Sequence, residues 1–258
     1  MCLVLIGYRI HPHYSLVIAA NRDEFHARPA LPLHWWTGGP RILAGRDMQA
    51  GGSWLGLDAS GRMALVTNYR DPSSPRPEAT SRGSLIGDFL GGRQGAVEFA
   101  RATAARAGNF AGFNLLALDH DGLGYVTSHP EPAARALPPG IYGLSNRQLD
   151  TPWPKLVRTR EQFELELARD CPRPEALMRI LSDRTIADDD ALPDTGIGLE
   201  WERLLSAAFI VSKGYGTRCS TVVLIGNDGR VNIEERSHQV DGAVSVRVRF
   251  VYQSESRK

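Results

Sequence analysis

The stretch Cys2-Leu3-Val4-Leu5-Ile6 begins directly after Met1, and it decides how the rest of the chain is interpreted. An apolar run of this length is typical of a strand buried on both faces. Removal of Met1 would leave a thiol and a free α-amine on one fixed residue. Such a residue carries its own base, because an α-amine with a pKa near ~7.7–8.0 accepts a proton at neutral pH. The alternative is that Cys2 is a small apolar residue that opens a strand.

Length and composition predict one domain over residues 1–258. The chain has 30 Lys and Arg against 29 Asp and Glu, a net charge of +1, so no overall field attracts nucleic acid or a membrane surface. Its 3 cysteines are too few and too widely spaced for a disulfide framework, which predicts a reducing, cytoplasmic location. No stretch reaches the ~18 apolar residues of a membrane span, and the N-terminal run lacks the features of a secretory signal. The oligomeric state is not predicted.

Strands are expected at both ends of the chain, with helices between them. The expected strands are 3–7, 15–20, 53–57, 63–67, 113–118, 124–127, 141–144, 208–211, 220–225, 231–235 and 244–252. The expected helices are 84–89, 96–107, 155–168 and 174–182. Exposed loops are expected at 71–81 and 188–190, and alternation at Val246, Val248 and Phe250 predicts an outer strand with one buried face. The pattern predicts two sheets packed face to face with helices outside.

Four polar residues, Asn21-Arg22-Asp23-Glu24, directly follow the second expected strand. Residues at the ends of buried strands commonly carry function, because a rigid sheet positions them. The Asp23 carboxylate would hold the α-ammonium or orient the nucleophile, and Arg22 would bind a substrate carboxylate or lower the pKa of the thiol. The alternative is a turn with an exposed ion pair.

Other polar residues also lie at the ends of expected strands. Asn68 and Asn146 each place an amide there that can donate to a developing oxyanion, although asparagine is also favoured in ordinary turns. The glycine-rich segment 51–56 predicts a close approach of backbone, or else a tight turn beside a core tryptophan, Trp54. Arg218 precedes an interior strand, and a buried guanidinium there would need an anion.

Several short motifs are spread over nearly the whole chain. They are Cys2, Asn21-Arg22-Asp23-Glu24, Gly-Gly-Ser-Trp-Leu-Gly at 51–56, Thr67-Asn68-Tyr69-Arg70-Asp71, Ser81-Arg82-Gly83, Gly143-Leu144-Ser145-Asn146 and Arg218-Cys219-Ser220-Thr221. Together they resemble the NRDE family, also called the transport and Golgi organisation 2 family. The resemblance implies an α+β fold, the four-layer αββα sandwich of N-terminal nucleophile hydrolases.

A more distant resemblance is to the bile-salt hydrolase and penicillin V acylase branch of those enzymes. It implies Cys2 as nucleophile and Asp23 as the group that steadies its amine. It also implies Asn68 and Asn146 at the oxyanion site and Arg218 beneath the nucleophile. The order of Arg, Asn and Asp around Asp23 differs from that branch, so its neighbour Arg22 shares the role in this interpretation.

The leading hypothesis is a hydrolase that cleaves a non-peptide C–N amide bond of a small molecule, with Cys2 as nucleophile and neither metal nor cofactor. The residues expected to bind the substrate are Arg22, Asn21, Trp54 and Tyr69. The alternative hypothesis is a carrier of a hydrophobic cofactor such as haem, because haem trafficking is proposed for some members of the family. Its ligands would be Cys2, His26 or His34, beside a cluster formed by Trp35, Trp36 and Trp54.

Overall fold

The structure is a computed structural model that describes residues 2–73 and 79–255. The chain forms two compact units. The first comprises Met1–Ala27, Arg70–Ser73 and Pro139–Gln253, and the second comprises Arg28–Tyr69, Ser74–Pro138 and Ser254–Lys258. The expectation of a single domain stays a prediction. Among the described residues, no helix combines the length and the apolar character needed to cross a bilayer.

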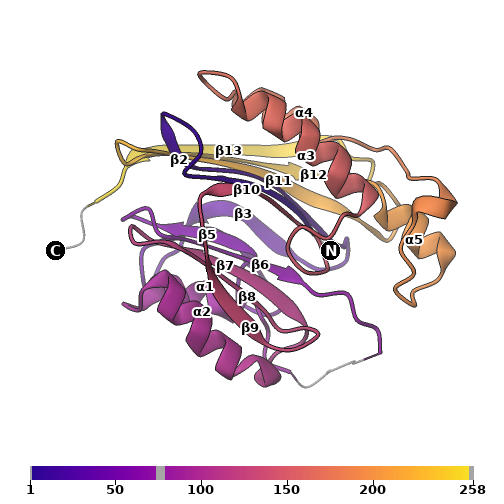
Figure 1. The fold of residues 1–258 in the computed structure, drawn as a ribbon, viewed down its shortest axis with the longest axis horizontal. Coiled ribbons are helices and arrows are strands. Elements are labelled where there is room, and N and C mark those ends of the chain that lie inside the picture. The colour runs from indigo at the N-terminus through magenta and orange to yellow at the C-terminus, as the bar shows by residue number, and fades with distance from the viewer. Residues whose placement is uncertain (1, 74–78, 256–258) are drawn as a thin grey trace. The chain divides into compact units, whose positions relative to one another are not determined.

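The first unit is built on a six-stranded antiparallel sheet (Figure 1). In spatial order its strands are β10 (Gly140–Leu144), β1 (Cys2–Tyr8), β2 (Tyr14–Phe25), β11 (Tyr215–Gly226), β12 (Arg230–His238) and β13 (Val244–Gln253). Helices α3 (Pro154–Leu167) and α4 (Pro174–Leu181) lie side by side on one face of this sheet. The same unit contains a 3-10 turn, Asp189–Ala191, and the short helix α5 (Leu199–Leu205).

Alternate residues of the central strands form the core of the first unit. Leu3 and Leu5 of β1 pack with Phe163 and Leu167 of α3, and all four are buried. The N-terminal run is therefore a buried strand, as the sequence predicts.

Two glycines allow α3 to lie close to the sheet. A Cβ atom on Gly143 of β10 would lie 2.6 Å from a methyl carbon of Leu156, and one on Gly7 of β1 would lie 2.6 Å from a methyl carbon of Leu167. Real Cβ atoms do not approach other heavy atoms so closely. The helix is thus seated on two positions that lack a side chain.

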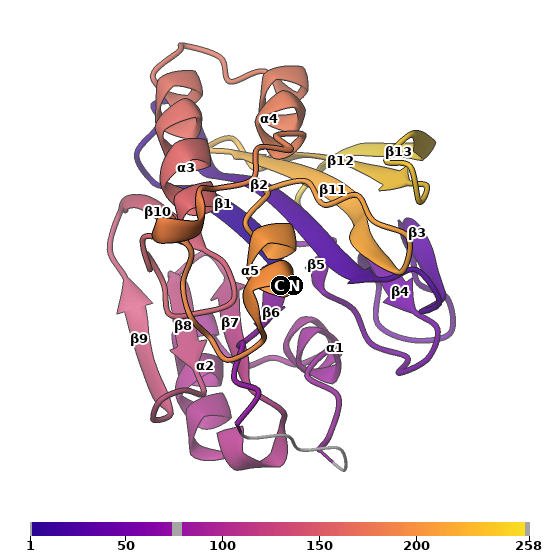
Figure 2. The same cartoon turned by 90° about the vertical axis from the view of Figure 1, so that its right-hand side faces the viewer.

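The second unit is a seven-stranded antiparallel sheet with helices α1 (Ser84–Gly91) and α2 (Ala96–Ala105) packed on it (Figure 2). In spatial order its strands are β3 (Ala30–Trp35), β4 (Ile42–Asp47), β5 (Leu55–Asp58), β6 (Met63–Asn68), β7 (Phe113–Leu118), β8 (Leu123–Thr127) and β9 (Ala133–Leu137). A 3-10 turn, Ala107–Asn109, follows α2. Phe89 of α1 and Phe99 of α2 pack in the core with tilted rings, 5.1 Å between ring centroids.

The expected helices and most of the expected strands are confirmed, since each unit has one sheet with helices on it. The expected strand 208–211 is wrong. Phe209 donates its N–H to the carbonyl of Asp183, and Ile210 donates to the Thr217 hydroxyl, so this apolar segment is a buried loop. Strands β3, β4 and β9 and helix α5 were not expected. Of the loop expected at 71–81, residues 74–78 lie outside the described part of the chain.

The outer strand β13 has no buried face, contrary to the sequence pattern. Val246 is 42% exposed, and Val248 and Phe250 are only half-buried. The reason is the face from which these side chains project at the edge of the sheet. Phe250 pairs with Ile233 and Ile233 with Val223, whereas α3 and α4 pack on the opposite face of β11, which carries Val222 and Leu224, so no helix of this unit covers them.

The glycine-rich segment 51–56 makes the close backbone approach that its sequence predicts. A Cβ atom on Gly52 would lie 2.4 Å from the carbonyl carbon of Gly83, and the N–H of Ser53 donates to the Gly83 carbonyl oxygen at 3.1 Å. Two of the sequence motifs therefore meet backbone to backbone in the second unit.

We predict that Gly52→Ala lowers the free energy of unfolding by about 1–3 kcal/mol, because the added methyl group has no space beside the Gly83 backbone. Urea denaturation followed by circular dichroism measures the change. Gly87→Ala is the matched control: this helical glycine has open space around its Cβ position, so the same substitution there should be neutral or stabilising by up to about 1 kcal/mol. Equal stability of the two variants would contradict the packing argument.

Candidate functional site

The register of three neighbouring strands determines which side chains surround Cys2. Cys2 of β1 lies directly opposite Arg22 of β2, and Arg22 lies opposite Cys219 of β11. Directly opposed residues project from the same face of an antiparallel sheet. Leu3, the next residue of β1, faces the helices. Cys2, Arg22 and Cys219 therefore lie on the face of this sheet that does not carry α3 and α4.

Cys2 is held by its backbone rather than by its side chain. Its N–H donates to Oδ1 of Asn146 at 3.1 Å, and its carbonyl oxygen accepts the hydroxyl of Ser145 at 3.0 Å. The backbone N–H of Asp23 acts on its sulfur and favours the thiolate. Burial nevertheless raises the pKa of the thiol, so the sulfur carries its proton at neutral pH and needs a base to become a nucleophile.

The carboxylate of Asp23 is buried in the first unit, with an exposed fraction of 1%. Its Oδ1 accepts the hydroxyl of Thr217 at 2.7 Å, and its backbone carbonyl accepts the hydroxyl of Tyr215 at 3.1 Å. Burial raises the pKa of this carboxyl, and the ammonium of Lys155 is the largest opposing charge. Residues of β11 thus hold Asp23 in place by hydrogen bonds, and the charge of Lys155 on α3 lowers the pKa of its carboxyl.

Arg218 occupies an irregularity in the pairing of β2 with β11. Thr217 pairs with Asp23 and Cys219 with Arg22, so Arg218 is the extra residue of a β-bulge. Its guanidinium donates to the carbonyl oxygens of Phe25 and His26 at 3.0 and 3.2 Å. Burial lowers its pKa, and the like charge of Arg22 adds to that effect. The expected role of Arg218 beneath the nucleophile stays a prediction.

Asn21 has a structural role that the sequence did not reveal. Both hydrogens of its amide are donated to backbone carbonyls, of Leu181 and of Ala208, each at 2.8 Å. Its Oδ1 accepts the hydroxyl of Ser220 at 2.6 Å. The side chain is 2% exposed and ties the C-terminal end of α4 and the loop that contains Ala208 to the sheet. The role in substrate binding expected for Asn21 stays a prediction, whereas Arg22 beside it faces the sulfur.

Asn146 connects Cys2 to a buried ion pair. Its backbone carbonyl accepts the N–H of Arg70 at 2.7 Å. The Arg70 guanidinium contacts the Glu202 carboxylate at 2.6 Å, and the two side chains are 6% and 5% exposed. Burial lowers the pKa of Arg70 to about 10, and Glu202 opposes the shift. Truncation of either partner would leave an uncompensated charge, which costs about 3–5 kcal/mol in such pairs.

Lys155 is a residue near the site that the sequence analysis missed. It is the second residue of α3, its exposed fraction is 1%, and its ammonium interacts with the charges of Asp23, Arg70, Cys2 and Glu202. One signal was present in the sequence. Lysine is rare in this chain, and a cation in the first turn of a helix is disfavoured by the helix dipole, so this lysine needed an explanation.

Three of the expected site residues belong to the second unit. Asn68 ends β6, half-buried, opposite Phe113. Tyr69 is buried and stacks on His129 at 5.0 Å between ring centroids. Trp54 covers Gly45, whose Cβ position lies 2.3 Å from the indole ring. The expected roles of these three residues in catalysis and substrate binding stay predictions.

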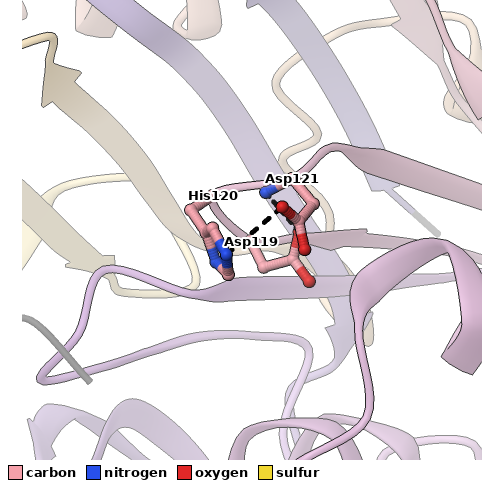
Figure 3. A group of neighbouring side chains, drawn as sticks. All are labelled: Asp119, His120 and Asp121. Atoms are coloured by element: carbon pink, nitrogen blue, oxygen red, sulfur yellow. Dashed lines mark hydrogen bonds and ion pairs between the residues drawn. The ribbon is translucent and has the colours of Figure 1, made fainter. Parts of the chain in front are cut away.

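Among the described residues, one group has the composition of a metal site, Asp119, His120 and Asp121 (Figure 3). It lies in the turn between β7 and β8. Asp119 Oδ1 accepts the N–H groups of Asp121 and Gly122, and its Oδ2 accepts the N–H of Ala96 at 2.6 Å, so this carboxylate closes the turn and caps α2. The group is explained as a turn and a helix cap.

The histidines and tryptophans of the carrier hypothesis have ordinary contacts. His26 and His34 bond to the carbonyl oxygens of Ser212 and Pro32, at 3.1 and 2.7 Å. The rings of Trp35 and Trp36 lie beneath the guanidinium groups of Arg41 and Arg46, respectively. None of these contacts distinguishes a haem pocket from a surface of half-buried side chains.

Comparison with known proteins identifies the family. The model of the Transport and Golgi organisation 2 family matches residues 1–239. The chain belongs to this family. It is 36% identical to the Transport and Golgi organization protein 2 homolog of Bos taurus and 35% identical to that of Homo sapiens, over 92% of this chain and 93% of each relative. It is 22% identical to the Transport and Golgi organization protein 2 of Drosophila melanogaster over 92% of both chains.

Two solved structures show the fold of this family member. The N-acylethanolamine-hydrolyzing acid amidase ortholog of Caenorhabditis elegans has a TM-score of 0.51 at 12% identity, over 86% of this chain and 92% of the other. A mutant conjugated bile acid hydrolase of Clostridium perfringens has a TM-score of 0.52 at 9% identity, over 98% of both chains. The expected α+β fold of the N-terminal nucleophile hydrolase class is confirmed.

We predict that Asn21→Ala lowers the free energy of unfolding by about 2–4 kcal/mol, because it leaves two buried carbonyl groups and one hydroxyl without this partner. Thermal and urea unfolding measure the change. Asn232→Ala is the control, since its side chain bonds to exposed Arg249, and it should cost less than about 0.5 kcal/mol. A stable Asn21→Ala protein would show that this motif residue does not hold the loops.

Proposed function

We propose that this protein is a cytoplasmic N-terminal nucleophile hydrolase that cleaves a non-peptide amide bond of a small molecule, with Cys2 as the nucleophile. The observation that carries the proposal is the placement of Cys2. Its nitrogen faces the Asn146 carboxamide at 3.1 Å, Arg22 lies directly opposite, and the backbone N–H of Asp23 acts on its sulfur. Removal of Met1 would convert that nitrogen into an α-amine beside a thiol that is protonated at neutral pH.

In the proposed reaction the α-amine takes the proton of the thiol, directly or through a water, and the sulfur attacks the amide carbonyl carbon. Backbone N–H groups and asparagine amides stabilise the resulting oxyanion. With Oδ1 of Asn146 turned toward the Cys2 nitrogen, Nδ2 is the donor atom of that amide. The new ammonium then protonates the departing amine, and water hydrolyses the thioester to release the acid and restore the thiol.

The surrounding charges favour this sequence of steps. Arg22 lowers the pKa of the thiol, against the larger effect of burial, so it favours the thiolate as the proton leaves. The charge of Asp23 raises the pKa of the same thiol, so its proposed part is to hold the α-ammonium that forms as the proton leaves. The names of the two solved structures, an amidase and a conjugated bile acid hydrolase, suggest which amides to test first.

We predict that incubation with a panel of N-acylethanolamines, conjugated bile acids and β-lactams gives an acyl adduct on Cys2 or release of the amine. Intact mass spectrometry detects the adduct and also shows whether Met1 has been removed. Cys2→Ala should abolish the adduct and lower any hydrolysis by about 10³-fold or more.

The matched control for this experiment is Cys171→Ser, which removes an exposed thiol distant in sequence from the site. It should leave both adduct and hydrolysis unchanged. A wild-type protein that retains Met1, forms no adduct and hydrolyses no member of the panel would overturn the proposal.

The carrier hypothesis makes a different prediction that is simple to measure. A haem carrier would give a saturable change in the Soret band on titration with haem, and substitution of a ligand would remove it. Neither the names of the relatives nor the contacts of His26, His34 and the tryptophans favour this hypothesis over the hydrolase.

A further inference from the structure

Lys155 is a buried ammonium that the proposed chemistry does not use. Its exposed fraction is 1%, and its Nζ has no hydrogen-bond partner among the residues the structure describes. Burial of a cation is costly unless an anion compensates it, and the first turn of α3 adds the unfavourable positive end of the helix dipole. The neighbouring charges must therefore explain why a lysine is there.

Four charged or ionisable groups act on Lys155, and they come from four different segments. Asp23 of β2 is the strongest attractive charge, followed by Cys2 of β1 and Glu202 of α5, whereas Arg70 repels the ammonium. Glu202 already has its own counter-ion, because Arg70 contacts it at 2.6 Å and Thr195 donates to its other oxygen. Asp23 is therefore the one carboxylate of this group that compensates Lys155.

The relation between Lys155 and Asp23 is reciprocal. Lys155 is the largest opposing charge on Asp23, just as Asp23 is on Lys155. Thr217 and Tyr215 hold Asp23 in place from β11. Cys2 lies directly opposite Arg22, the residue before Asp23, and the charge of Asp23 acts on Cys2, so the carboxylate that compensates Lys155 is also the one available to an α-ammonium on Cys2.

We infer that Lys155 is a positioning residue, which keeps the α-amine of Cys2 unprotonated by competing with it for the carboxylate of Asp23. The inference rests on the proposed function, because only a chain without Met1 carries that amine. The carboxylate of Asp23 already faces two cations, Lys155 and the buried guanidinium of Arg22, so it has no negative charge to spare for a third. If the amine takes a proton from solvent, the site gains a positive charge that no group compensates. If the amine takes the proton of the thiol, the thiolate that forms compensates the new ammonium.

The charge of Lys155 agrees with this competition. Burial lowers the pKa of Lys155 to about 8, so the lysine remains mostly charged at neutral pH and keeps its claim on the carboxylate. A neighbouring cation is a known means of keeping an amine neutral and reactive. Lys155 would thus act on the base of the reaction without contacting the substrate.

The test is the pKa of the α-amine at position 2, measured on the full chain in a Cys2→Ala background, where the thiol is absent. Trace acetylation as a function of pH, quantified by mass spectrometry of the N-terminal peptide after Met1 removal, gives this value. Adding Lys155→Met should raise it by about one unit. Adding Lys213→Met, at an exposed lysine, should leave it unchanged. If Lys155→Met does not fold, Lys155→Gln serves as the second variant.

An amine pKa that stays constant or falls when Lys155 is replaced would overturn the inference. A merely structural lysine would change the melting temperature and leave the amine pKa where it was. The measurement needs no substrate. If the amine pKa shifts but no member of the panel is hydrolysed, the proposed function is wrong while the inference about Lys155 still holds. Where hydrolysis occurs, the ascending limb of the kcat/KM profile of Lys155→Met should move to higher pH by the same amount.

Discussion

The pairing of β1 with β2 is the constraint on which the candidate site depends. It sets Cys2 opposite Arg22 and Leu3 opposite Asn21, so one face carries the sulfur and the guanidinium and the other carries the core and the loop-binding amide. A slip of one residue would exchange these faces. The four-residue motif at the end of β2 therefore serves two purposes, anchoring loops through Asn21 and surrounding the nucleophile through Arg22 and Asp23.

Much of this arrangement was predictable from sequence. Continuous apolar runs indicated β1 and β2, and the polar residues that follow them indicated where chemistry would gather. The strand predicted at 208–211 was wrong because burial alone does not make a strand: the backbone of that loop bonds to Asp183 and Thr217. The apolar side chains of β13 were expected to be buried, but they project from the edge of the sheet on the face opposite α3 and α4, and the pattern of a single strand does not encode what covers that face.

The site shows the same division between local and long-range information. Cys2, Arg22, Asp23 and Asn146 meet in the first unit, and each belongs to a motif visible in the sequence. The roles of Lys155, Arg70 and Glu202 depend on contacts between segments far apart in the chain, so no local pattern marks them. The structural task of Asn21 was hidden for the same reason, since its carbonyl partners are 160 and 187 residues away.

Gly7 and Gly143 have a consequence beyond packing. Each lies under a leucine of α3, so a methyl group at either position would lift the helix from the strands instead of filling a void. Lys155 lies in the first turn of that helix, so moving the helix away from the strands would increase the distance between Lys155 and the Asp23 carboxylate. With Lys155 acting as we infer, two positions that do not touch the sulfur would influence the acid–base balance at Cys2, and substitutions there could change reactivity while Cys2, Arg22 and Asp23 stayed the same.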